Sequence, residues 1–172
     1  IKECKNNKLK YFVLGNGSNL LFPDYDLDTI LISLKNFNKI SKKENFVYFE
    51  AGVNMFSLNK FCLENSLTNL EWSFGLPASF GGLVYMNGGA YEHTIFDYIR
   101  RVKVLNNNKV VWLKKNDIQF TYRKSNISGI ILGGEIILNK SDKKTVENKQ
   151  KYYFECRKST QPLIYPCGGS IF

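Results

Sequence analysis

The chain has 172 residues, of which 44% are hydrophobic and 15% aromatic, enough to bury a core and too apolar for an intrinsically disordered protein. Its net charge of +9 comes mainly from lysines scattered among asparagines, which indicates a residue-usage bias more than a nucleic-acid-binding stripe. No apolar run approaches the roughly 18 residues that cross a bilayer, and the start lacks the apolar core of a signal peptide. We therefore expect a cytoplasmic protein with no membrane or nucleic-acid partner.

The first half of the chain is predicted to contain three short apolar strands followed by one amphipathic helix. Asn54 is a predicted N-cap, and the helix that follows it places Met55, Leu58 and Cys62 on one face. The predicted strands are KYFVL at residues 10–14, DTILISL at 28–34 and NFVYFEAG at 45–52.

The second half begins with a glycine-dense but apolar stretch, residues 71–92, unlike a polar flexible linker. A hairpin of two alternating strands, a strand with a glycine bulge and a polar surface helix are predicted after it. They cover residues 100–114, 128–138 and 143–159. This order predicts an α+β fold with a domain junction near residues 145–160.

Cysteine and histidine usage argues against metal or disulfide chemistry. The four cysteines, at positions 4, 62, 156 and 167, contain no CxxC pair, so we expect them to be reduced and to bind no zinc. The one histidine, His93, is more typical of a loop or surface residue than of a catalyst. We therefore predict no metal site.

The first candidate site is VLGNGSNLL at residues 13–21, where a strand runs into a glycine loop. The loop offers backbone N–H groups with little side-chain obstruction, as phosphate-binding nests do. It lacks the third glycine of a dinucleotide-binding fingerprint and the GK[ST] of a P-loop. By itself it is as compatible with a tight turn as with a phosphate site.

Three further segments carry candidate chemistry. In GLPASFGGLVYMNGGAY, residues 75–91, the glycines either let a flat ligand approach the backbone or form a turn between core elements. FTYRKS places Arg123 beside Tyr122; the planar fork of an arginine can hold an anion, although such pairs are often surface contacts. YPCGGSIF sets Ser170 after two glycines, which indicates another close approach.

Together and in this order, the four segments resemble the UDP-N-acetylenolpyruvoylglucosamine reductases, flavoenzymes of cell-wall precursor synthesis. The resemblance covers nearly the whole chain. The short spacing between YRKS and GGSIF is similar to the compact branch of the family, which lacks an extra loop in its substrate domain. The motifs that carry the resemblance are LGNGSNLL, GLPASFGGLVYMNGGAY, FTYRKS and QPLIYPCGGSIF.

The resemblance implies an α+β FAD-binding fold of the vanillyl-alcohol-oxidase (PCMH) type, with two subdomains, and NADPH as the hydride donor. Residues 1–40 would belong to the first FAD-binding subdomain, 41–145 to the second, and 146–172 to a linker and the beginning of a substrate-binding domain. Glycines and N–H donors suit a flat ring and a diphosphate. The implied FAD-binding residues are Gly15, Asn16, Gly17, Ser18, Asn19, Gly75, Pro77, Ser79, Gly81, Gly82, Asn87, Gly89 and Ala90.

The resemblance also implies the reaction, which reduces the enolpyruvyl group of a UDP-sugar ether to give UDP-N-acetylmuramate. Arg123 matches the residue that stabilises the developing enolate, and Ser170 matches the proton donor. The implied substrate-binding residues are Tyr122, Ser125, Arg157, Lys158 and Gly169.

Two positions depart from the family pattern. Ala78 stands where many relatives have glycine, and Thr160 stands where they often carry a diphosphate-binding lysine, for which Lys158 is a substitute. The family's third catalytic residue, a C-terminal glutamate, has no counterpart in the sequence, and the resemblance predicts further chain at both ends.

Two other functions stay open beside this one. The chain could belong to a flavin-dependent oxidoreductase of the same superfamily with another substrate, or to a catalytically inactive flavin- or nucleotide-binding module. YRKS and GGSIF argue against the first, because those residues serve the enolpyruvyl chemistry. In the leading hypothesis the protein is a monomer whose partner is a small-molecule substrate.

Overall fold

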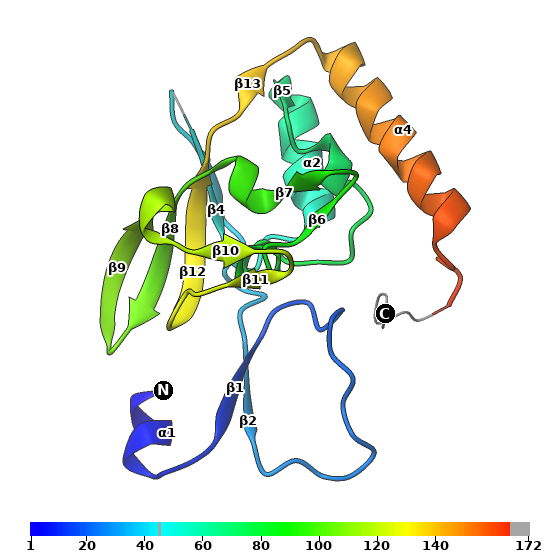
Figure 1. Cartoon of the computed structure of the whole chain (residues 1–172). Coiled ribbons are helices and arrows are strands. Elements are labelled where there is room, and N and C mark those ends of the chain that lie inside the picture. The colour runs from blue at the N-terminus through cyan, green and yellow to red at the C-terminus, as the bar shows by residue number, and fades with distance from the viewer. Residues whose placement is uncertain (45, 166–172) are drawn as a thin grey trace.

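The largest element of the computed structural model, which describes residues 1–44 and 46–165, is a five-stranded antiparallel sheet (Figure 1). Its strand order is β3-β4-β12-β8-β9. The predicted hairpin of β8 and β9 and the predicted strand at β4 are confirmed, whereas β3 is absent from the prediction. The strands are β3 (Ile40–Lys42), β4 (Val47–Glu50), β8 (Ile99–Asn106), β9 (Lys109–Lys114) and β12 (Ile130–Ile136).

The N-terminal part is a separate pair of parallel strands preceded by helix α1 (Lys2–Asn6). β1 (Tyr11–Leu14) pairs with β2 (Ile30–Ser33), which confirms the two predicted strands. Residues 15–29 connect them without a helix and begin with the first glycine loop. In Figure 1 this pair lies beneath the large sheet, with the glycine loop between the two parts.

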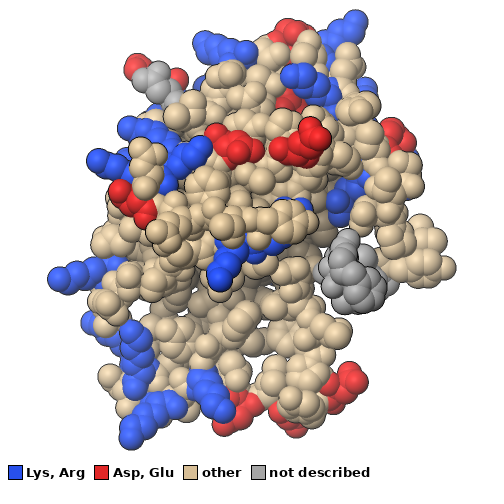
Figure 2. All heavy atoms as spheres, viewed as in Figure 1, with Lys and Arg blue, Asp and Glu red and all other residues tan. Residues whose placement is uncertain are grey.

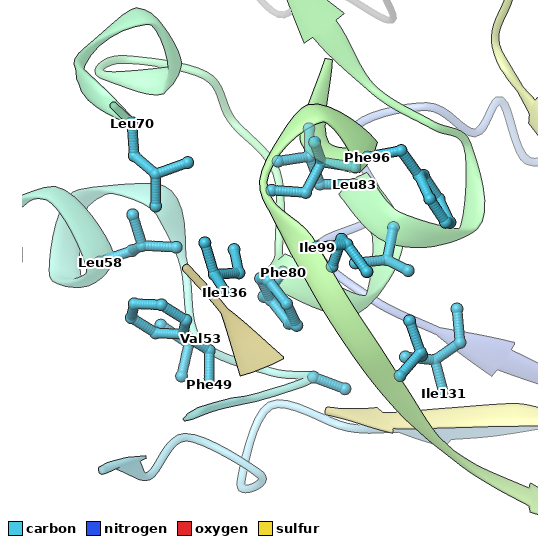
Figure 3. Close-up of a cluster of buried hydrophobic side chains, with 14 of the residues drawn as sticks. Phe49, Val53, Leu58, Leu70, Phe80, Leu83, Phe96, Ile99, Ile131 and Ile136 are labelled. Atoms are coloured by element: carbon cyan, nitrogen blue, oxygen red, sulfur yellow. The ribbon is translucent and has the colours of Figure 1, made fainter. Parts of the chain in front are cut away.

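Helices α2 (Met55–Glu64) and α3 (Phe80–Tyr85) cover one face of the large sheet. The link is aromatic: the ring centroid of Phe49 on β4 lies 6.2 Å from that of Phe61 on α2 and 5.6 Å from that of Phe80 on α3. The Asn54 side chain caps α2 by accepting a hydrogen bond from the Ser57 N–H at 2.8 Å, as predicted. Figure 3 shows the buried cluster that results.

Strand β12 contains the predicted glycine bulge. Its register against β8 shifts between Ile131 and Gly133. A side chain at Gly133 would place Cβ 2.6 Å from the Tyr48 hydroxyl, so only glycine lets the Tyr48 ring lie across the strand.

The remaining elements are short, except for α4 (Lys143–Thr160), which confirms the predicted polar helix. The Asp142 side chain caps α4, and Gln150 is buried on it, where its Nε2 donates to the Asn59 carbonyl of α2 at 2.9 Å. The chain also contains β5 (Leu67–Thr68), η1 (Glu71–Ser73), β6 (Gly89–Ala90), β7 (His93–Thr94), η2 (Ile95–Asp97), η3 (Lys115–Asp117), β10 (Phe120–Thr121), β11 (Lys124–Ser125) and β13 (Asn139–Lys140). The proposed subdomain boundaries at residues 40 and 145 stay predictions.

The surface carries its positive charge in several separated places. On the face drawn in Figure 2, basic side chains lie around the edge and also near the centre, with acidic ones among them. Across the part of the chain that the structure describes, none of the helices combines the length and the apolar character that a bilayer crossing requires.

Candidate cofactor and active site

The first two glycine segments, more than 60 positions apart in the sequence, are in contact. The Asn16 side chain donates from Nδ2 to the Pro77 carbonyl at 2.8 Å. A Cβ on Gly15 would lie 2.5 Å from the Ser79 hydroxyl, so the two backbones approach as closely as they do because Gly15 has no side chain. Gly17 adopts a φ of 77°, in the left-handed region that glycine favours. The structure thus brings together two of the segments that the sequence singled out.

The second glycine segment is anchored to the connection between β4 and α2. The Phe80 N–H donates to the Val53 carbonyl at 2.7 Å, and the Gly81 N–H to the Ala51 carbonyl at 2.8 Å. Ser79 caps the short helix α3 by accepting from the Gly82 N–H at 3.3 Å. Residues 80–85 are therefore helical. The sequence predicted either a turn or a ligand-facing loop for this segment, and neither included a helix.

Asn87 lies where α3 ends and holds the third motif in place. It is 3% exposed, with a φ of 41°, and its Nδ2 donates to the Thr121 carbonyl at 2.9 Å. Its Oδ1 is buried and has no hydrogen-bond partner among residues 1–44 and 46–165. A buried amide oxygen without a partner is costly, so this atom is a candidate acceptor for a bound ligand.

The FTYRKS motif forms the small hairpin of β10 and β11, and its tip carries Arg123. Arg123 has a φ of 55°, and its guanidinium donates from Nη2 to the Gly89 carbonyl at 2.8 Å while lying over the Tyr122 ring, 4.7 Å from its centroid. The Ser125 hydroxyl donates to the Tyr85 carbonyl at the end of α3, also at 2.8 Å. The hairpin is thus fixed to the second glycine segment at both ends of the motif, and Tyr122 stays 83% exposed.

Arg157, on the last turns of α4, lies against the start of the second glycine segment. Gly75 has a φ of 81°, and a Cβ there would lie 3.3 Å from Arg157 Cδ and 2.9 Å from the Phe154 ring. Arg157 Nε is buried without a hydrogen-bond partner in the described part of the chain. Lys158 behaves differently, since its ammonium pairs with Glu155 at 3.2 Å on the helix surface.

The remaining predicted residues fall into three groups. Ser18 and Ala90 are half-buried, whereas Asn19 and Pro77 are exposed. Gly169 and Ser170 lie outside the described residues, so the position of the predicted proton donor is not part of the arrangement above. The role assigned to each individual residue stays a prediction.

An open cavity of about 360 Å³ adjoins Asn16 and adds residues that the sequence analysis missed. It is lined by Asn16, Lys35, Asn38, Gly52, Val53, Asn54 and Ser57. Lys35 supplies a positive charge beside the first glycine loop, as a phosphate would require. Its sequence context, a lysine after an apolar strand, does not distinguish it from the other lysines, so only the fold could identify it.

The glycine segments and the unpartnered polar atoms beside them fit a flavin dinucleotide. A Cβ on Gly15 would collide with the Ser79 hydroxyl and one on Gly81 with Ala51, so both positions require glycine. Two buried polar atoms, Asn87 Oδ1 and Arg157 Nε, have no hydrogen-bond partner among residues 1–44 and 46–165. A model of the FAD binding domain family matches residues 1–114. The chain belongs to the FAD binding domain family. The expected α+β fold of the FAD-binding type is therefore confirmed.

Two sequence relatives of this FAD-binding domain carry the same name. The "UDP-N-acetylenolpyruvoylglucosamine reductase" of Clostridium novyi (strain NT) is 36% identical over 176 residues, covering 100% of this chain and 57% of the relative. That of Thermotoga maritima is 36% identical over 167 residues, covering 95% of this chain and 59% of the relative. The resemblance found in the four motifs is thus confirmed, and the chain spans a little over half the length of the curated relatives it matches.

Solved structures agree on the fold. The reductase (MurB) of Thermus caldophilus has a TM-score of 0.80 at 24% identity, over 93% of this chain and 60% of that one. The 6-hydroxy-D-nicotine oxidase of Arthrobacter nicotinovorans has a TM-score of 0.59 at 17% identity, over 81% of this chain and 33% of that one. The FAD-binding domain therefore shares its fold with a reductase and an oxidase, and the substrate must be argued from the site.

Proposed function

We propose that the protein carrying this FAD-binding domain reduces the enolpyruvyl group of UDP-N-acetylglucosamine enolpyruvate to give UDP-N-acetylmuramate, with NADPH as hydride donor. The observation that supports it most is the hydrogen bond from Arg123 to the Gly89 carbonyl, which fixes a guanidinium at the rim of the second glycine segment. Relatives named UDP-N-acetylenolpyruvoylglucosamine reductase match along the whole chain. Flavin binding alone would not require an arginine at this place.

The chemistry needs a fixed positive charge and a proton. When bound, FAD supplies hydride transfer between NADPH and the substrate. Reduction at C3 of the enolpyruvyl group leaves negative charge at C2, delocalised into the neighbouring carboxylate, and the guanidinium of Arg123 would stabilise that charge. The Ser170 hydroxyl would then deliver a proton to C2, in the role implied by the family resemblance.

The two glycine segments would hold the cofactor. Backbone N–H groups of residues 15–19 would face the diphosphate, with Lys35 near enough in the adjoining cavity to balance its charge. Asn87 Oδ1 would accept a hydrogen bond from the cofactor or substrate, and Arg157 would reach the same space from α4. We further propose that the enzyme is a cytoplasmic monomer, in line with its small-molecule substrate.

Half-reactions measured on the full-length protein test this function. The purified protein should be yellow, NADPH should bleach its flavin absorbance, and the enolpyruvyl substrate should restore it. Arg123→Ala should leave bleaching by NADPH intact and slow the restoring step by about 100-fold, as removal of one charge-stabilising donor does.

Each half-reaction can fail separately. A full-length protein that cannot be reconstituted with FAD would contradict the flavoenzyme assignment, and this would favour an inactive module. A flavin that NADPH bleaches but that the enolpyruvyl substrate never restores would favour an oxidoreductase acting on another substrate. Equal loss of both steps in Arg123→Ala would make Arg123 a structural residue.

A further inference from the structure

A second cavity, of about 440 Å³, lies between η1, β7 and α4, and no residue assigned to the cofactor or substrate lines it. Its walls are largely aromatic. The Trp72 and His93 rings stack at 24° with centroids 6.2 Å apart, and the Tyr153 ring meets His93 edge-on. The His93 ring is held by a 2.8 Å hydrogen bond between its Nδ1 and the Tyr98 hydroxyl, so this wall is rigid.

The cavity also contains a buried acid with no positive partner. Glu71 is 4% exposed and accepts hydrogen bonds from the Thr68 hydroxyl at 2.5 Å and the Asn69 N–H at 2.8 Å. Both donors are neutral, and among the described residues no lysine, arginine or histidine nitrogen lies within 4 Å of its carboxylate. A buried charge is normally paired, so this one lacks the compensation expected of it.

The negative charge of Glu71 extends across the cavity. Burial and then the charge of Glu71 raise the pKa of the Tyr153 phenol on the facing helix. Lys149 lies at the wall, and its ammonium contacts the Thr68 hydroxyl at 3.5 Å, so it is linked to the carboxylate only through that hydroxyl. The cavity therefore combines a buried carboxylate that no ammonium or guanidinium among the described residues contacts directly with aromatic side chains in its walls.

We propose that this cavity binds an organic cation, a primary or quaternary ammonium group, with Glu71 as its counter-charge and Trp72, His93 and Tyr153 as its aromatic walls. Aromatic faces attract ammonium groups, and the attraction grows when both are removed from water. An anionic ligand would face Glu71 directly, and a neutral apolar ligand would leave the carboxylate uncompensated. This site is independent of the proposed reductase activity.

Titration of the full-length protein with n-butylammonium chloride and with tetramethylammonium chloride tests the site. The readout is the NMR signal of the Trp72 indole N–H, assigned by comparison with Trp72→Phe. We expect a saturable shift with a Kd on the order of 1 mM. n-Butanol, the neutral counterpart, and sodium chloride at equal ionic strength should produce no saturable shift.

Two charge variants and one control separate the causes. Glu71→Gln should weaken cation binding by about tenfold or more, because it removes the counter-charge. Glu147→Gln makes the same change at an exposed position of α4, where Glu147 pairs with Lys151, and should leave Kd unchanged. Lys149→Met should tighten binding by about threefold, since it removes a competing ammonium from the cavity wall.

The proposal is overturned if no cation gives a saturable shift, if n-butanol matches n-butylammonium, or if Lys149→Met weakens binding. Equal effects of Glu71→Gln and Glu147→Gln would also overturn it. If Glu71→Gln fails to fold, the comparison of charged with neutral probe and the Lys149→Met result decide the matter. A cavity already filled by another part of the full-length protein would show no binding and would count against it.

Discussion

At the residue scale, Glu135 on β12 is the most tightly held charge in the described part of the chain. Its carboxylate accepts two hydrogen bonds from Arg101, at 2.6 and 2.7 Å, and one from Arg100 at 2.6 Å. Burial favours the protonated acid, but these hydrogen bonds outweigh it and lower the pKa of Glu135 below its ordinary value of 4.5. The folded sheet therefore favours the ionised form of Glu135.

Replacing this acid should destabilise the fold. We expect Glu135→Gln to reduce the free energy of unfolding by about 2 kcal/mol at pH 7, less than the 3–5 kcal/mol typical of a fully buried pair, because both arginines are partly exposed. Urea denaturation followed by circular dichroism measures the change. Glu147→Gln, at an exposed ion pair, is the matched control and should unfold like the wild type.

The same residue sets a pH dependence whose sign is fixed. Because the pKa of Glu135 is lowered on folding, its contribution is complete above pH 4.5 and is lost as pH falls through the folded-state value. The stability difference between wild type and Glu135→Gln should therefore shrink when urea denaturation is repeated at decreasing pH below 4.5. A constant difference across that range would show that the charge of Glu135 is not what stabilises the sheet.

At the element scale, the hairpin of β10 and β11 carries Arg123 and is fixed by hydrogen bonds to the second glycine segment. Two side chains join it to α3 and the residues after it, the Ser125 hydroxyl to the Tyr85 carbonyl and Asn87 Nδ2 to the Thr121 carbonyl. The family resemblance implies that Ser125 binds the substrate. In the structure the Ser125 hydroxyl donates to the Tyr85 carbonyl. We therefore expect a substitution of Ser125 to displace Arg123 on the same hairpin.

Loss of the Ser125 contact should slow turnover more than it affects the cofactor. We expect Ser125→Ala to lower kcat by about tenfold, because a displaced guanidinium stabilises the enolate less well, while NADPH bleaches the flavin at the wild-type rate. Ser125→Thr keeps the hydroxyl and should recover most of the activity. Lys124→Ala, a change on the same hairpin at an exposed position, serves as the control.

If Ser125→Ala lowers flavin retention as strongly as turnover, Ser125 does not act by positioning Arg123, and the hairpin supports the cofactor loop itself. Stopped-flow measurement of both half-reactions distinguishes these outcomes.

Elements with a local signal were predictable and the others were not. α2 has a polar cap and a buried face, and β8 and β9 alternate around a turn, so their patterns match their structures. β3 is half-buried at Ile40 only and exists because it pairs with β4, which a single sequence does not show. α3 contains the poor helix formers Gly81 and Gly82, and a Cβ on Gly81 would lie 2.8 Å from the Ala51 Cβ, a packing requirement that no local pattern shows.

At the scale of the whole molecule, the candidate site is where the N-terminal strand pair meets the body built on the large sheet. The sequence could identify the two glycine segments, but their contact depends on tertiary packing that no local pattern carries. Lys35 and the Asn87 Oδ1 atom also could not be predicted as site groups from the sequence. Lys35 is identified by the cavity it lines, and Asn87 Oδ1 by its burial without a hydrogen-bond partner among the described residues. The motifs therefore identified segments that lie in contact, and the fold supplied how they are joined.

The joint itself can be tested at Gly15, because a methyl group there would lie 2.5 Å from the Ser79 hydroxyl. Gly15→Ala should push the two glycine segments apart and weaken FAD binding by about tenfold, about 1.4 kcal/mol, measured by flavin fluorescence on reconstitution of the apoprotein. The midpoint of urea denaturation should hardly change, since the large core lies elsewhere.

Removing the hydroxyl should relieve the clash. In Gly15→Ala/Ser79→Ala the nearest side-chain atom to the new methyl group is the residue-79 Cβ at 3.8 Å, an ordinary contact. We therefore expect the double variant to bind FAD more tightly than Gly15→Ala, although Ser79→Ala alone costs about 1 kcal/mol of helix capping at α3. Additive losses in the double variant would mean that the two segments do not share the cofactor across this contact, because a steric conflict between two side chains must disappear when either one is removed.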